Sequence, residues 1–338
     1  MNIVILDDYQ DVVRKLDCAV KLDAYNAKVY TNTVKGTGQL GVRLRDADVL
    51  VLIRERSSFN KVLLEKLPAL KLISQTGKVS GHIDVAAATA NKIAIAEGVG
   101  DPTAPAELTW ALIMAATRRI PQYAANLKAG AWQQAAATPQ HNRIGTALKG
   151  RTLGIWGYGK IGQRLARYAQ AFDMPVLVWG SDNSRAAAKA DGHAAAASRE
   201  AFFAEADIVS LNLRLSDQTR HGVTFDDLSH MKPDALLVNV SRAELIAPGA
   251  LLQALDAGRP GYAAVDVYEE EPLLDPAHPL LRHPRVLSTP HLGYVEKNGY
   301  ELYFGDAFDN VLAFFDGVPK NVANPQALAL QRLNPVRP

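Results

Sequence analysis

The stretch TLGIWGYGKIGQRLARYAQAF, residues 152–172, places a glycine-rich turn between an apolar strand pattern and a helical pattern. The helical part puts Ile161, Leu165, Tyr168 and Phe172 on one side. In this context G-x-G-x-x-G is typical of a dinucleotide-binding turn. The first glycine permits the tight turn, the second lets backbone N–H groups approach a pyrophosphate, and the third lets the helix pack on the strand. The predicted cofactor-binding residues of the turn are Gly157, Tyr158, Gly159, Lys160, Ile161 and Gly162.

Short apolar runs alternate with helical patterns on both sides of this turn. Strands that alternate with helical patterns of this length indicate βαβ units and a parallel sheet. The alanine-rich stretch 186–197 lies between two such runs, and we expect it to form a surface helix. The runs predicted as strands are 2–6, 47–53, 70–74 and 92–96 in a first series, and 151–156, 175–179, 206–212, 235–240, 262–267 and 285–289 in a second.

Helical patterns at 104–119 and 296–315 flank the second series, so we infer that one domain is inserted into another. The predicted fold is α/β, with two Rossmann-like doubly wound parallel-sheet domains and a cleft between them. The inserted dinucleotide-binding Rossmann domain is expected at 120–295. Residues 1–119 plus 296–338 are expected to form a flavodoxin-like, substrate-binding domain.

Composition narrows the classes of function. The 338 residues carry a net charge of +2, with 48% hydrophobic and 21% charged residues, which is typical of a globular protein. This balance indicates neither a nucleic-acid nor a membrane partner. The single cysteine, Cys18, allows no internal disulfide and no thiolate metal site, so we expect a cytoplasmic protein without a bound metal. The N-terminal segment lacks the pattern of a signal peptide.

The end of the second strand of the Rossmann unit bears on the choice of cofactor. An acid there usually binds the adenosine ribose hydroxyls, but this chain has Gly180. Asp182 comes two residues later and could bind the ribose. Alternatively, Ser181, Asn183 and Arg185 could hold a 2′-phosphate, which Asp182 would repel. The sequence leaves NAD and NADP open, with a slight preference for NAD.

Charged residues follow three later strands of the second series. Arg242 follows one strand, Asp266 and Glu271 lie at and after the next, and His291 follows the last. Ligands of open parallel sheets bind outside the carboxyl ends of the strands, so these side chains share an edge with the glycine turn. An arginine can grip a carboxylate, and a histidine beside a glutamate can donate a proton to a carbonyl oxygen. This set suits hydride transfer to a 2-keto acid. Spacing alone does not show which of the three consecutive glutamates at 269–271 is the partner of the histidine.

Taken together, these motifs resemble the D-isomer-specific 2-hydroxyacid dehydrogenase family. The resemblance covers nearly the whole chain and rests on GYGKIG (157–162), NVSRAELI (239–246), AAVDVYEEEPL (263–273) and STPHLGY (288–294), in family order. It implies an NAD(P)-dependent oxidoreductase that acts on a small 2-keto or 2-hydroxy acid. It also implies a homodimer built on the dinucleotide-binding domain.

The resemblance assigns roles to individual residues. Arg242 matches the substrate-binding arginine, and His291 matches the acid/base. The glutamate directly before Pro-Leu is the catalytic one, which selects Glu271. Asp266 matches the aspartate that contacts the nicotinamide carboxamide. In the other domain, the resemblance implies that the turn Gly77, Lys78, Val79 cradles the substrate carboxylate and that Arg54 or Arg56 adds a charge contact.

Two other functions share this fold in the family's relatives. Corepressors that sense dinucleotides have a similar cleft but rely on added partner-binding segments, which are not evident here. Formate dehydrogenases replace the glutamate partner of the histidine with glutamine, and Glu271 argues against that function. The side chain of the substrate stays open among glyoxylate, hydroxypyruvate, pyruvate and 3-phosphohydroxypyruvate.

Overall fold

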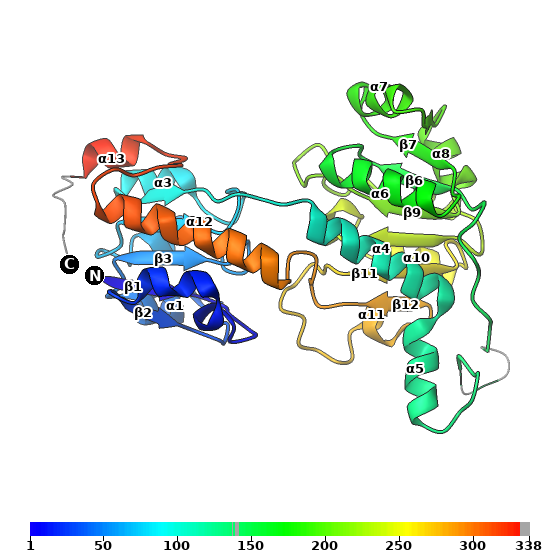
Figure 1. Ribbon diagram of the computed structural model, residues 1–338, viewed down its shortest axis with the longest axis horizontal. Coiled ribbons are helices and arrows are strands. Elements are labelled where there is room, and N and C mark those ends of the chain that lie inside the picture. Colours follow the sequence, from blue (N-terminus) through cyan, green and yellow to red (C-terminus); the bar gives the residue numbers. More distant parts are fainter. Residues whose placement is uncertain (137, 139–141, 332–338) are drawn as a thin grey trace. The chain divides into compact units, whose positions relative to one another are not determined.

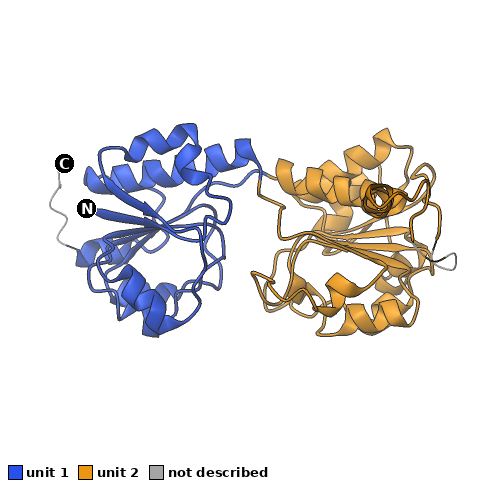
Figure 2. Cartoon of the chain, turned by 90° about the horizontal axis from the view of Figure 1, so that it is seen from below, with its two compact units in different colours: residues 1–101, 296–338 blue, residues 102–295 orange. Residues whose placement is uncertain are grey.

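A computed structural model describes residues 1–136, 138 and 142–331 of the chain. The chain forms two compact units, shown in different colours in Figure 2. Unit 1 consists of residues 1–101 and 296–338, and unit 2 consists of residues 102–295. The first boundary between the two units therefore lies at residue 101, whereas the sequence had predicted it at residue 119.

The described part of unit 1 contains a five-stranded parallel sheet in the order β2-β1-β3-β4-β5. The side chains of β3 and β4 are buried throughout, as expected for strands covered by helices on both faces. The edge strand β2 has no apolar run and three exposed residues, so its sequence gave no strand pattern. The strands are β1 (Asn2–Ile5), β2 (Asn26–Val29), β3 (Val49–Leu52), β4 (Leu72–Gln75) and β5 (Ala94–Ala96).

The last long helix of the chain, α12 (Lys297–Phe315), belongs to unit 1 and packs on β3 and β4 (Figure 1). After it, Val322 pairs with Ala96 of β5 in an antiparallel bridge. The buried Asn324 side chain accepts a hydrogen bond from Ile95 N and donates to Ile93 O, which ties the C-terminal segment to the sheet. The other helices of unit 1 are η1 (Val13–Lys15), η2 (Asp17–Leu22), α1 (Thr37–Leu44), α2 (Lys61–Leu64), α3 (Val85–Ala90) and α13 (Gln326–Leu330).

The described part of unit 2 contains a seven-stranded parallel sheet in the order β12-β11-β10-β9-β6-β7-β8. The chain runs outward from β6 to β8 and then returns to β9 on the other side of β6, so the topological switch point lies between β6 and β9. The strands are β6 (Leu153–Trp156), β7 (Val176–Trp179), β8 (Ala194–Ala195), β9 (Ile208–Leu211), β10 (Leu236–Asn239), β11 (Tyr262–Val265) and β12 (Val286–Ser288).

Alternate residues of these strands face two separate hydrophobic cores. Ile155 of β6 packs in one core with Leu165, whereas its neighbour Trp156 packs in the other with Phe202 and Phe203. Helices therefore cover both faces of the sheet, as the sequence predicted. These helices are α4 (Thr103–Arg118), α5 (Ile120–Lys128), α6 (Lys160–Ala171), α7 (Asp182–Ala190), α8 (Arg199–Glu205), α9 (Phe225–Ser229), η4 (Ala243–Leu245), α10 (Ala250–Asp256) and α11 (Pro279–Arg282).

Two sequence predictions need correction in unit 2. Helix α4 packs on α6, β10 and β11, so it belongs to the dinucleotide-binding unit and not to the N-terminal domain. The alanine-rich stretch 186–197 is only partly helical, because α7 ends at Ala190 and Gly192 adopts a φ of 82°. The chain then forms the edge strand β8, which pairs with β7.

No helix in the described residues is long and apolar enough to cross a membrane.

Candidate active site

The glycine turn joins β6 to α6, at the switch point of the unit 2 sheet. Gly157 has a φ of 98°, and a Cβ atom there would lie 2.7 Å from the carbonyl oxygen of Asn212. A Cβ atom on Gly162 would collide with the carbonyl oxygen of Gly157. A Cβ atom on Gly159, by contrast, would meet open space. The first and third glycines thus permit the tight fold, and the second borders a space that an anion can occupy.

The N-terminus of α6 opens onto the same space. Gly159 is its N-cap residue, and no side chain caps the first N–H groups. A helix of 12 residues with uncapped N–H groups attracts anions through these donors and the helix dipole. The turn therefore fits the pyrophosphate of a dinucleotide.

The side chain of Tyr158 points into the protein. Its hydroxyl donates to Asp191 Oδ2 at 2.9 Å, and burial together with this hydrogen bond raises the pKa of Tyr158 to about 12. Tyr158 therefore offers only its backbone to a ligand at the turn. Ile161 packs against the core beside α6, whereas Lys160 is exposed at the start of the helix.

At the end of β7, Gly180 adopts a φ of 147°, which L-residues rarely adopt. Ser181 caps α7 by accepting a hydrogen bond from Ser184 N. Asp182, whose side chain is 93% exposed, forms an ion pair with Arg185. The guanidinium of Arg185 also lies over the Trp179 ring, 4.8 Å from its centroid. The two opposite charges near the predicted ribose site are therefore paired with each other.

The structure brings together two of the predicted catalytic residues. Nδ1 of His291, after β12, lies 2.6 Å from Oε2 of Glu271, after β11. The other carboxylate oxygen of Glu271 accepts the Tyr268 N–H at 3.0 Å. Glu269 and Glu270 are exposed, so the geometry distinguishes Glu271 from its two acidic neighbours.

Electrostatics favour the charged form of Glu271. Burial desolvates its carboxylate and opposes ionisation, but several partners outweigh this penalty. The hydrogen bond and charge of His291, the Tyr268 N–H and the charge of Arg242 together hold the pKa of Glu271 below its usual value. Glu271 is thus a carboxylate at neutral pH, beside the imidazole.

Asp266, at the end of β11, holds the turn that carries His291. Its Oδ1 accepts hydrogen bonds from Thr289 Oγ1 at 2.6 Å and Leu292 N at 2.8 Å, and its Oδ2 accepts from Gly293 N at 2.9 Å. His291 has a φ of 52°, a conformation that the surrounding turn must stabilise. Asp266 is fully buried, and this desolvation raises its pKa.

Arg242 follows β10, the strand next to β11 in the sheet. The side chain of Asn239 fixes its backbone by donating to Arg242 O at 2.8 Å and by accepting from Ser241 N at 3.0 Å. The guanidinium donates to Ser241 O at 2.7 Å. Arg242, Glu271 and His291 therefore come from the carboxyl ends of three adjacent strands.

The carboxyl edge of the unit 1 sheet carries the residues predicted to bind the substrate. Arg54, with a φ of 51°, follows β3, and its guanidinium lies against Gly77, where a Cβ atom would collide with it. Arg56 donates to Asp7 O and to Tyr300 Oη at 3.1 Å, and it lies over the Tyr9 ring. Of the two arginines, Arg54 is the one that reaches the turn at 77–79.

Glu97 holds this turn and was not among the residues predicted from the sequence. One carboxylate oxygen accepts the Val79 N–H at 2.9 Å, and the other accepts from Lys78 Nζ at 3.0 Å. Gly98 N donates to Gly77 O at 2.8 Å and adds a third link. One feature of the sequence could have identified Glu97: it is an acid directly after the predicted strand 92–96. That position lies at the carboxyl edge of the sheet, where the turn at 77–79 also lies. Among the described residues, no cluster of histidine, cysteine and acidic side chains is suited to hold a metal ion.

Comparison with known proteins gives consistent matches. Residues 110–293 match the family model described as D-isomer specific 2-hydroxyacid dehydrogenase, NAD binding domain. A glyoxylate reductase from Aeropyrum pernix is 36% identical over 295 residues, which cover 86% of this chain and 87% of the relative.

Two solved structures are more similar still. A Ralstonia solanacearum oxidoreductase, provisionally named D-3-phosphoglycerate dehydrogenase, is 54% identical with a TM-score of 0.94 and coverage of 97% and 98% of the two chains. A phosphoglycerate oxidoreductase from Vibrio cholerae is 53% identical with a TM-score of 0.90 and coverage of 93% and 98%.

Proposed function

We propose that this chain, which belongs to the D-isomer specific 2-hydroxyacid dehydrogenase family, reversibly reduces a small 2-keto acid to the D-2-hydroxy acid. Family membership makes it an oxidoreductase that acts on CH–OH groups with a nicotinamide dinucleotide. The observation that carries the assignment to residues is the 2.6 Å contact between His291 and Glu271, on the sheet edge that also carries Arg242 and the glycine turn.

In the proposed mechanism, the glycine turn and the N-terminus of α6 would hold a nicotinamide dinucleotide, which would be the source of hydride for the substrate carbonyl. The guanidinium of Arg242 grips the substrate carboxylate and polarises the neighbouring carbonyl. His291 donates the proton on Nε2 to the carbonyl oxygen, which becomes the hydroxyl of the product. Glu271 stabilises the imidazolium and orients it through Nδ1. In the oxidation direction, Nε2 accepts the hydroxyl proton.

Asp266 acts in this proposal mainly as a positioning residue. Three donors of the turn after β12 already occupy its carboxylate oxygens. It therefore fixes the direction of the His291 ring, in addition to the contact with the nicotinamide carboxamide that the family resemblance implies.

The cofactor proposal keeps a slight preference for NAD over NADP. The pairing of Asp182 with Arg185 reduces the positive charge that a 2′-phosphate would need. Fluorescence titration with NADH and NADPH tests this proposal without turnover. Arg185→Ala should leave NADH affinity nearly unchanged, and Asp182→Asn should improve NADPH affinity. Tighter binding of NADPH than of NADH by the parent protein would reverse the assignment.

Unit 2 is proposed to bind the dinucleotide, and unit 1 is proposed to add contacts to the substrate beyond that of Arg242. In unit 1, the proposed contacts are Arg54 and the backbone of the turn at Gly77, Lys78 and Val79. Arg56 instead ties the segment after β1 to α12. The relatives are named for glyoxylate and phosphoglycerate, so the first panel of substrates contains glyoxylate, hydroxypyruvate, pyruvate and 3-phosphohydroxypyruvate. Oxidation of NADH or NADPH with one of these acids supports the function. Absence of turnover with all four, despite cofactor binding, would count against it.

We also propose a homodimer formed through unit 2. Ile120, Leu127, Trp132 and Ile144 are large apolar residues of one segment of this unit, and more than half of each is exposed. Light scattering after gel filtration should give twice the mass of 36.6 kDa, and Leu127→Glu should lower it. A monomeric parent protein would exclude the dimer. The single cysteine favours a cytoplasmic location, which localisation of a tagged chain tests.

A further inference from the structure

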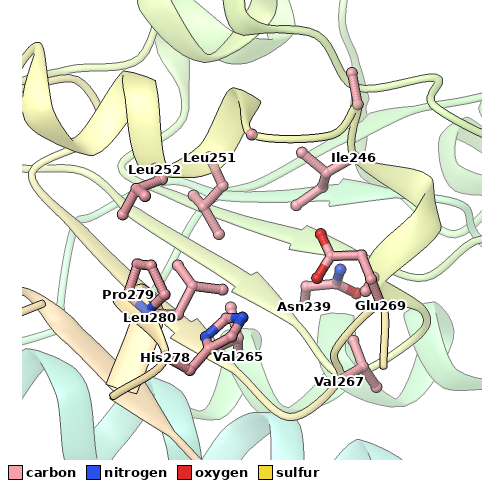
Figure 3. Close-up of a pocket in the computed structure, with 13 residues that line it drawn as sticks. Asn239, Ile246, Leu251, Leu252, Val265, Val267, Glu269, His278, Pro279 and Leu280 are labelled. Carbon is pink, nitrogen blue, oxygen red and sulfur yellow. The ribbon is translucent and has the colours of Figure 1, made fainter. Parts of the chain in front are cut away.

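Unit 2 contains a small pocket to which no part of the proposed mechanism assigns a role. Its volume is about 190 Å³, and it lies between the segment from η4 to α10, the ends of β10 and β11, and the loop that leads to α11 (Figure 3). Its walls are largely apolar. The main wall residues are Ile246, Leu251, Leu252, Val265 and Leu280.

Two ionisable side chains line this pocket from different sides. Figure 3 shows the carboxylate of Glu269 turned toward the wall formed by Leu251 and Ile246. His278 lies near Val265 and Pro279, and its buried Nδ1 has no hydrogen-bond partner in the described structure.

The lining of the pocket contains one carboxylate and no lysine or arginine. An anion inside it would therefore be repelled by Glu269, with His278 as its only possible positive partner, whereas an ammonium group would gain an ion pair with Glu269. The apolar walls favour a hydrocarbon body next to that ammonium group. Charge and polarity together select a small apolar amine.

The pocket is directly connected to the candidate catalytic residues. Asn239 lines it, and the same side chain holds the backbone of Ser241 and Arg242. Glu269 belongs to the loop that carries Glu271, one residue beyond Tyr268, whose N–H binds the Glu271 carboxylate. A molecule in the pocket would thus contact Asn239, which supports Arg242, and Glu269, the chain neighbour of the residue whose N–H binds Glu271.

We propose that this pocket is an effector site, in which a small apolar amine binds between Glu269 and the Leu251–Leu252 wall and shifts the segments that carry Arg242 and Glu271. Binding is independent of the proposed function, whereas the effect on catalysis rests on it. The two parts are therefore measured separately.

The binding test compares three probes of one shape: 3-methylbutylamine, 3-methylbutanol and 3-methylbutanoate. Saturation-transfer NMR with the full chain should detect the amine and not the carboxylate, with the alcohol weaker than the amine. Glu269→Gln should weaken amine binding by about two- to fivefold, the range expected for an exposed ion pair. Glu270→Gln is the matched control, since this neighbouring acid does not line the pocket, and it should bind the amine as the parent does.

A second variant, Leu252→Trp, should fill the pocket and abolish binding of all three probes. Equal binding of amine and carboxylate, no detectable amine binding, or equal weakening by Glu269→Gln and Glu270→Gln would overturn the site. If Leu252→Trp does not fold, the comparison of amine binding by Glu269→Gln and Glu270→Gln is sufficient to test the site.

The kinetic test uses oxidation of a D-2-hydroxy acid, because a primary amine would condense with an added keto acid. Saturating 3-methylbutylamine should change the KM for the hydroxy acid by at least twofold in the parent and in Glu270→Gln, and not in Leu252→Trp. Binding without any change of KM or kcat would refute the effector role and leave the site intact. A chain that binds the amine but oxidises no 2-hydroxy acid would instead contradict the proposed function.

Discussion

His291 and Glu271 form a pair in which Nδ1 of the imidazole lies 2.6 Å from Oε2 of the carboxylate. They stand 20 residues apart in the sequence and meet because β11 and β12 are neighbours in the sheet. The pair directs Nδ1 toward the glutamate, so in the proposed mechanism Nε2 is the nitrogen that exchanges a proton with the substrate.

Replacing His291 with alanine should lower kcat by about 10²- to 10⁴-fold, because general acid–base catalysis is lost. The glycine turn at 157–162 lies on different elements, so the affinity for the dinucleotide should not change. Steady-state kinetics and cofactor titration on the same preparation measure both quantities. Near-parental kcat in this variant would show that another group supplies the proton.

Glu271→Gln should alter the pH dependence of keto-acid reduction. Reduction needs a protonated imidazole, and the neutral glutamine stabilises the imidazolium less than the carboxylate does. The rate should therefore begin to fall at a lower pH than in the parent protein. Glu270→Gln is the matched control, because Glu270 is exposed. Superimposable pH profiles for the parent and Glu271→Gln would remove Glu271 from the mechanism.

Arg242→Ala should lower kcat/KM for the keto acid by about 10- to 150-fold, the loss expected for hydrogen bonds to a charged group. Arg242→Lys should recover only part of this loss, because lysine lacks the planar fork. Kinetics with all three proteins measure the effect. If Arg242→Ala retains the parental KM and kcat, this residue does not bind the substrate carboxylate.

Glu97→Ala should raise the KM for the keto acid more than it lowers kcat, because the turn at 77–79 loses its links to Val79 N and Lys78. Glu97→Gln keeps an acceptor for the Val79 N–H and should restore most of the affinity. The split between KM and kcat distinguishes a positioning role from general destabilisation. Equal KM values for the parent and both variants would contradict the role of Glu97.

Asp207 should contribute to stability above acidic pH. Burial of its carboxyl opposes ionisation, but the Lys232 ammonium and the Thr152 N–H outweigh burial and lower its pKa below 3.8. A group whose pKa is lowered by folding stabilises the protein above its unfolded pKa, and this contribution is lost as the pH falls through the folded pKa. Asp207→Asn should therefore lower the free energy of unfolding by about 1–3 kcal/mol at pH 7.

Urea denaturation at pH 7 and near pH 3 measures this difference. The gap between parent and Asp207→Asn should shrink at the lower pH. Asp217→Asn, at an exposed position, is the control and should match the parent at both values. A gap of the same size at pH 3 would show that ionisation of Asp207 is not the cause.

The sequence alone predicted those elements whose residue pattern depends only on neighbours along the chain. The glycine turn lies between an apolar run and an amphipathic helix, and both patterns are readable without any partner. The strand end that carries Arg242 was equally readable, because a buried parallel strand such as β10 has a continuous apolar run. Edge strand β2, with the sequence NAKV, has no such pattern, since pairing with β1 defines it.

Contacts between distant segments could not be predicted from the sequence. Glu97 meets Lys78 and Val79 through the pairing of β4 with β5, and no spacing rule encodes this contact. The three hydrogen bonds that Asp266 accepts likewise depend on the conformation of the turn after β12. The boundary at residue 101 depends on the packing of α4 against α6, which is a tertiary interaction.

The stereochemistry of the product tests the proposed reaction most directly. Chiral chromatography is applied to the product of whichever prochiral keto acid, hydroxypyruvate, pyruvate or 3-phosphohydroxypyruvate, oxidises the reduced cofactor fastest, because glyoxylate gives an achiral product. The parent protein should form one D-2-hydroxy acid per cofactor oxidised, and His291→Ala should form it at least 100-fold more slowly, as expected for loss of an acid–base catalyst. An L product, a racemate, or cofactor oxidation without a hydroxy acid would contradict the proposed reaction.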